Sequence, residues 1–70
     1  MKVTEMAQKT DKELQQLVVD TRSEIAGLLI DLQTKKVTNV KSVWAARRTL
    51  AQALTLLRER QIAEMEKNND

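Results

Sequence analysis

The sequence predicts an all-α fold: an antiparallel hairpin of two long helices, forming a single domain over residues 1–70. Two observations predict it. The chain contains one Gly, no Pro and one aromatic residue, and it is rich in Leu, Ala, Glu, Lys, Arg and Gln, which favour helices over sheets. Apolar residues also recur at helical spacing in two stretches, and the pattern is interrupted once, near residue 36. A chain this short buries little apolar surface, so we expect a partner to help stabilise it.

The first long helix is expected over residues 11–34, after a weaker amino-terminal segment. Val3, Met6 and Ala7 allow one short helical turn before it, but little in the sequence would hold that turn in place. Thr10 and Glu13 form the T-x-x-E pattern of a capping box, which marks a helix start. Residues at alternating steps of four and three then form one apolar stripe on this helix: Leu14, Val18, Thr21, Ile25, Leu28 and Leu32. Leu17 and Leu29 lie beside this stripe and widen it.

The second long helix is expected over residues 40–67. The segment 35–39 breaks the first pattern, and either Thr38 or Asn39 can cap the next helix. A second apolar stripe follows at helical spacing: Val43, Ala46, Leu50, Ala53, Leu54 and Leu57. Because the link is short, the two helices should be antiparallel neighbours. The two alanines of the stripe would let them pack closely.

Composition excludes several classes of function. The chain has no Cys and no His, so a disulfide framework, a Cys/His zinc site and a catalytic thiol or imidazole are all excluded. The carboxylates are dispersed and there is no Gly-rich phosphate loop, so we expect no enzyme activity, cofactor, metal or small-molecule substrate. The sequence has neither a membrane span nor the apolar core of a signal peptide. The absence of Cys fits a reducing compartment.

Charge is unevenly distributed along the chain. Residues 35–60 carry seven basic groups against one acidic group, a net charge of +6, whereas residues 1–34 and 61–70 each carry −2. The basic groups of the central block are Lys35, Lys36, Lys41, Arg47, Arg48, Arg58 and Arg60. A block this basic between acidic flanks suggests a polyanion as partner.

Several of these residues gather on one flank of the second helix. At 100° per residue, the flank beside the apolar stripe contains residues suited to bridging RNA phosphates: Trp44, Arg47, Arg48, Thr55 and Arg58, with Gln52 at its border. Lys35, Lys36 and Lys41 extend the positive charge around the turn. Arg60 points away from this flank, to solvent or to an acidic group of the first helix.

A simpler interpretation is that this flank is only a solvated helix face. However, Arg47 and Arg48 have no acidic residue within one helical turn. A solvated helix face normally combines acidic and basic residues, which form ion pairs with each other. Trp44 is compatible with two interpretations: an exposed indole that stacks on a base, or a residue at the edge of the core that covers the helix junction.

The segment ARRTLAQALTLLRER, residues 46–60, resembles the signature of the large-subunit ribosomal protein family numbered twenty-nine. That signature has two basic residues, a variable position, an aliphatic residue and an alanine, followed by T-x-L-R-E-R. The resemblance extends back through Asn39 and TDKELQQLVVDTRSEIAGLL, covering about residues 5–62 without a gap. It implies a helical hairpin in which Arg47, Arg48, Thr55 and Arg58 contact large-subunit ribosomal RNA.

The resemblance also implies a location. A member of this family would lie near the peptide tunnel exit, beside another tunnel-exit ribosomal protein, in a cytoplasmic or organellar ribosome. Two alternatives remain open. One is a coiled-coil adaptor or self-associating hairpin without nucleic-acid binding, since both apolar stripes would also fit a four-helix dimer. The other, a membrane-surface element, is less favoured because the second helix lacks Phe and has a single Trp.

Overall fold

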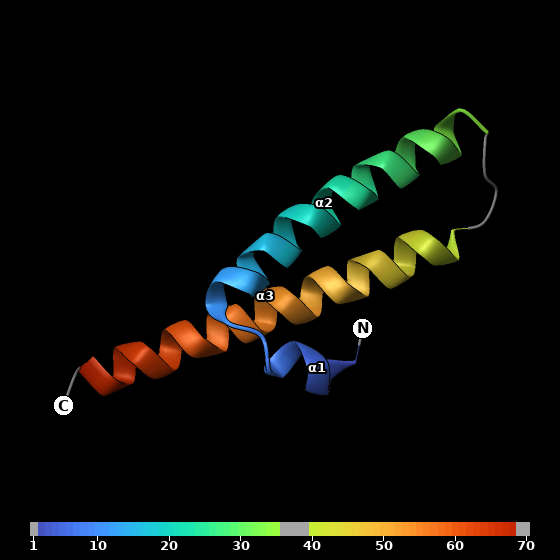
Figure 1. The fold of residues 1–70 in the computed structure, drawn as a ribbon. Coiled ribbons are helices and arrows are strands. Elements are labelled where there is room, and N and C mark those ends of the chain that lie inside the picture. Colours follow the sequence, from blue (N-terminus) through green and yellow to red (C-terminus); the bar gives the residue numbers. More distant parts are fainter. Residues whose placement is uncertain (1, 36–39, 69–70) are drawn as a thin grey trace.

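The computed structural model describes residues 2–35 and 40–68 and contains three helices in that part of the chain. These are α1 (Val3–Ala7), α2 (Asp11–Gln33) and α3 (Lys41–Asn68). Helices α2 and α3 form an elongated antiparallel hairpin, 54 × 19 × 15 Å overall, and α1 lies against α3 (Figure 1). The predicted all-α hairpin is therefore confirmed, with each long helix ending within one residue of the expected bounds.

Helix α2 begins at the predicted cap. The backbone amide of Glu13 donates to Thr10 Oγ1 at 3.2 Å, and that hydroxyl donates to Glu13 Oε1 at 3.1 Å. The carboxylates of Asp11 and Glu13 in the first turn also suit the positive end of the helix dipole. The helix ends at Gln33 and is followed by the C-cap residue Thr34, after which Lys35 takes a left-handed backbone conformation with φ of 62°. The caps expected at Thr38 or Asn39 lie outside the described residues.

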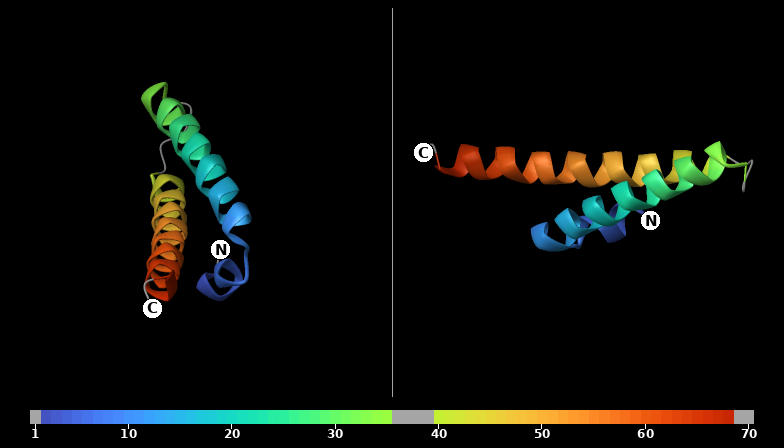
Figure 2. Two further views of the ribbon diagram at one scale, coloured as in Figure 1. Left: turned by 90° about the vertical axis from the view of Figure 1, so that its left-hand side faces the viewer. Right: turned by 90° about the horizontal axis from the view of Figure 1, so that it is seen from above.

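The hydrophobic core cluster lies at the end of the hairpin away from the turn, where all three helices meet (Figure 2), and Val43 and Ala46 of α3 are also buried nearer the turn. The fully buried or nearly buried members of the cluster come from each helix: Met6 of α1, Leu14 and Val18 of α2, and Ala53 of α3. Along α2, the stripe residues become less buried toward the turn, from Leu14 to the half-buried Leu32. Thr21, also buried, satisfies its hydroxyl by donating to the carbonyl of Leu17 at 2.7 Å.

Helix α1 is held more firmly than the sequence indicated. The side chain of Met6 is fully buried in the core. In addition, Arg60 of α3 joins both earlier helices: its Nη1 lies 2.8 Å from Asp11 Oδ1, and its Nη2 donates to the carbonyl of Ala7 at 3.0 Å. The pairing of Arg60 with an acidic group of the first long helix, one of the two outcomes expected, is thus the one observed.

Two residues assigned to the apolar stripes are not buried. Leu29 is 44% exposed and Leu54 is 39% exposed, so their assignment to the core was wrong. For Leu54, the reason is that α3 packs against α1 as well as α2. Its buried arc therefore includes the half-buried Leu56, which packs against the core, and leaves Leu54 on the solvent side.

Candidate nucleic-acid interface

The three arginines predicted to bind RNA lie exposed on α3. Arg47, Arg48 and Arg58 make no ion pair and no side-chain hydrogen bond with any residue in the part of the chain that the structure describes. Arg60, by contrast, has its guanidinium engaged by Asp11 and Ala7. Three guanidinium groups are therefore directed to solvent with their donor groups available.

Trp44 lies on the same helix with 62% of its surface exposed. An indole this exposed does not cover the helix junction, so the edge-of-core interpretation is wrong. An exposed indole presents a flat apolar face with a single N–H donor at its edge, a chemistry suited to stacking on a base.

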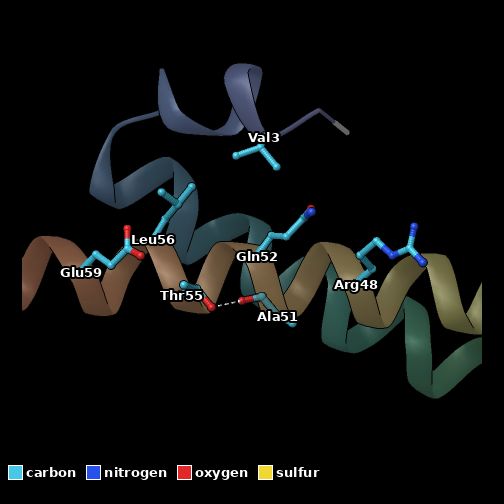
Figure 3. Close-up of a pocket in the computed structure, with 7 residues that line it drawn as sticks. All are labelled: Val3, Arg48, Ala51, Gln52, Thr55, Leu56 and Glu59. Atoms are coloured by element: carbon cyan, nitrogen blue, oxygen red, sulfur yellow. Dashed lines mark hydrogen bonds between the residues drawn. The ribbon is translucent and has the colours of Figure 1, made fainter.

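The two polar residues of the predicted flank differ from the arginines. Thr55 Oγ1 donates to the carbonyl of Ala51 at 2.8 Å, so its hydrogen is used within the helix and only its lone pairs face outward. Gln52 is half-buried and projects toward α1 (Figure 3). Thr55 is thus a poor donor to phosphate, and Gln52 belongs to a more enclosed environment than the arginines.

Part of the predicted flank lines a groove between α1 and α3. The groove has a volume of about 310 Å³, and its lining residues are Val3, Arg48, Ala51, Gln52, Thr55, Leu56 and Glu59 (Figure 3). The structure therefore brings together Arg48, Gln52 and Thr55 in the groove, whereas Trp44, Arg47 and Arg58 do not line it. Val3 and Glu59 were not predicted, because only the docking of α1 places them there.

The predicted lysines lie away from this groove. Lys35 follows the end of α2, and Lys41 is the first residue of α3, so both flank the turn and both are exposed. Lys36 lies outside the described residues. The described lysines therefore extend the positive charge to the turn end of the hairpin.

The exposed face of α3 also contains apolar side chains that were not predicted to belong to an exposed surface. Val40, Leu54, Ile62 and Met65 are all exposed, and they fall on the same side of the helix as the arginines. A signal for them exists in the sequence. Positions 40, 44, 47, 51, 54 and 58 alternate steps of four and three, which defines a second stripe on α3, partly apolar and partly basic.

Another groove, between α2 and α3, differs in charge. It has a volume of about 410 Å³, and Glu24 is the charged residue among those that line it: Leu17, Thr21, Glu24, Ser42, Ala45, Ala46 and Thr49. Glu13, Asp20 and Asp31 fall on the same side of α2 as Glu24. The hairpin thus separates an acidic edge on α2 from the basic face of α3.

Fold and surface together define a small helical-hairpin protein with a basic face whose arginines have no partners among the residues that the structure describes. The family model described as Ribosomal L29 protein matches residues 4–60. The chain belongs to this family, as the resemblance in its second helix indicated. The family is structural and not enzymatic.

Relatives support the same assignment. The chain is 34% identical over 62 residues to the large ribosomal subunit protein uL29 of Kosmotoga olearia, covering 89% of this chain and 94% of that protein. It is 36% identical over 62 residues to the proteins of the same name from Coprothermobacter proteolyticus and Desulforudis audaxviator, with 89% of this chain covered in both cases and 97% and 92% of those proteins, respectively. No solved structure shows significant similarity to the chain. Among the described residues, no helix has the length and apolar character needed to cross a membrane.

Proposed function

We propose that this chain binds ribosomal RNA through the exposed face of α3 that contains Trp44, Arg47, Arg48 and Arg58, hereafter the basic face. The family establishes the coarser part of the function: the chain is a structural constituent of the large ribosomal subunit, and its place is within the ribosome, which is cytoplasmic in bacteria. Our proposal adds to this role the particular residues that bind RNA.

The observation that carries the proposal is the difference among the arginines of α3. Arg60 is engaged by two partners within the chain, whereas Arg47, Arg48 and Arg58 have none among the described residues. A guanidinium forms short, often bidentate hydrogen bonds to phosphate, and each phosphate neutralised releases condensed counterions. Binding of RNA would therefore satisfy donors that the folded chain leaves unused.

The remaining predicted residues have supporting roles in this proposal. Lys35, Lys36 and Lys41 would contribute point charges toward the turn, while Gln52 and Thr55 would contact RNA at the edge of the basic face. The position near the peptide tunnel exit, beside another tunnel-exit protein, follows from the family resemblance and is part of the proposal.

A second candidate function is self-association of the hairpin or its use as a helical adaptor. The observation that favours it is the exposure of apolar side chains on both long helices, including Val19 and Ile30 on α2 and Leu54 and Met65 on α3. Self-association predicts a concentration-dependent oligomer, which sedimentation would detect, and no requirement for Arg47 or Arg48.

Equilibrium binding to large-subunit ribosomal RNA over a salt series tests the proposal. We expect Arg47→Ala/Arg48→Ala to bind more weakly and to reduce the salt slope by about one to two units, since each lost phosphate contact removes about 0.9. Lys12→Ala/Arg22→Ala is the matched control, because it removes two exposed cations from α2 instead. Circular dichroism checks that both variants fold. Equal losses in the two variants, or no preference for ribosomal RNA over an unrelated polyanion, would contradict binding through the basic face.

A further inference from the structure

We propose that the groove between α1 and α3 holds one unpaired RNA base, and that it prefers a base with an exocyclic amino group, adenine above uracil. The proposal rests on RNA binding by the basic face and adds a specific site to it. It assigns a function to α1, which contributes no basic residue to that face.

The shape and lining of the groove suit one flat ring. Val3 projects from α1 toward α3, and Ala51 and Leu56 of α3 supply further apolar surface (Figure 3). Small-molecule sites range from about 300 to 1,000 Å³, so a groove of about 310 Å³ is at the small end of that range. Proteins hold extruded bases by packing aromatic or apolar side chains against their faces and by hydrogen bonds to their edges. This groove offers apolar packing and polar groups for the edge.

The polar groups are ordered along the groove. Arg48 and Glu59 lie at opposite ends, eleven residues or roughly 16 Å apart along the helix. Arg48 adjoins Arg47 of the basic face, so the phosphate of the bound nucleotide would lie at that end. The base would then extend toward Glu59. This charge arrangement favours a nucleotide over an apolar peptide side chain, which needs no cation beside it.

Base preference follows from the two groups that can reach the base edge. The amide of Gln52 can both donate and accept, which is the pattern that pairs with adenine. The carboxylate of Glu59 only accepts, so it favours a base with an amino group. Uracil has no exocyclic amino group, and its carbonyl oxygens would face the carboxylate of Glu59 unfavourably.

The test compares three RNA hairpins that share one stem: fully paired, with one bulged adenosine, and with one bulged uridine. We expect the full-length chain to bind the adenosine bulge about fivefold to tenfold more tightly than the other two, the low end of what one good base contact supplies. With 2-aminopurine in place of the bulged adenosine, its fluorescence should become protected from acrylamide quenching on binding.

Two variants make the test specific. Ala51→Leu fills the groove from an exposed helical position and should abolish both the protection and the adenosine preference, the latter measured as the ratio of the affinities of this variant for the adenosine-bulge and paired hairpins. Gln52→Leu should reduce the preference for adenosine over uridine. Ala63→Leu, an exposed position on α3 that lines neither groove, should behave like the natural chain.

The outcomes separate this proposal from RNA binding itself. If all three hairpins bind equally through Arg47 and Arg48 and Ala51→Leu changes nothing, the base site is wrong and the basic face stands. If no hairpin and no ribosomal RNA binds, both proposals are wrong.

Discussion

The end of the hairpin where three helices meet differs from the end at the turn in how fully its apolar side chains are covered. At the first end, Met6 and Leu14 are fully buried, and Arg60 ties α1 and α2 to α3. Toward the turn, Val43 and Ala46 of α3 are buried, but Leu28 and Leu32 of α2 are only half-buried, and Ile30 and Trp44 are exposed. Two helices alone can cover only one stripe of each other, so a third element is needed to close a core. The core cluster that includes α1 is therefore confined to one end of the hairpin, whereas the turn end is closed by contacts between α2 and α3 alone.

Leu14→Ala should have the largest effect on stability of the changes considered. Truncation of a fully buried Leu lowers the free energy of unfolding by about 2–5 kcal/mol. The core of a chain of this size supplies only about 3–5 kcal/mol of stability in total. Leu29→Ala removes the same atoms from a side chain that is 44% exposed and should cost much less. Urea unfolding followed by circular dichroism measures both. Equal losses would show that the turn end contributes as much to the core as the three-helix end.

Arg58→Ala and Arg60→Ala should have opposite effects, although the two residues lie two positions apart on α3. Arg58 has no partner among the described residues, so its loss should leave stability unchanged and lower the salt slope of RNA binding by about 0.9. Arg60 donates to Ala7 and Asp11, so its loss should destabilise the fold by about 0.5–1.5 kcal/mol. Thermal unfolding paired with RNA titration of the same two samples distinguishes them. A loss of stability in Arg58→Ala would show that the Arg58 side chain stabilises the fold and is not available to bind RNA.

The same comparison explains which features could be predicted from sequence. The long helices follow from local signals, namely the Thr10 cap and the two periodic stripes, so their bounds were predicted to within one residue. The contact of α1 with α3 is not local. It brings Met6 into the same buried cluster as Ala53, more than forty residues later in the chain, and no periodic pattern within α1 predicts that packing.

That missed contact accounts for the errors at the site. Without α1 in place, the buried arc of α3 was centred too close to Leu54, and the groove lined by Val3 and Glu59 could not be foreseen. The exposed positions of Arg47, Arg48 and Arg58 were predictable, because a basic block with a single acidic residue has few internal partners. Their contact with RNA remains a proposal.

Thr10→Ala should have a moderate effect, confined to the three-helix end. The substitution removes the acceptor for the amide of Glu13, and loss of such a cap typically costs about 1 kcal/mol. Thr10→Ser keeps the hydroxyl and should be close to neutral. Denaturant midpoints measure the difference, and amide hydrogen exchange at the start of α2 localises it. Equal stability of the Ala and Ser variants would mean that the cap contributes nothing measurable.

Lys35→Gly should have the smallest effect and the opposite sign, and it probes the turn end. Lys35 has φ of 62°, a conformation that costs an L-residue about 1 kcal/mol or more and glycine very little. The greater freedom of glycine in the unfolded chain offsets part of this gain, so we expect a net stabilisation of about 0.5 kcal/mol. Lys35→Ala is the control, since it removes the same charge and retains the Cβ that makes the conformation costly. The two variants should therefore weaken RNA binding equally while differing in stability. If glycine instead matched alanine in stability, the turn end would not maintain this left-handed conformation in the free chain.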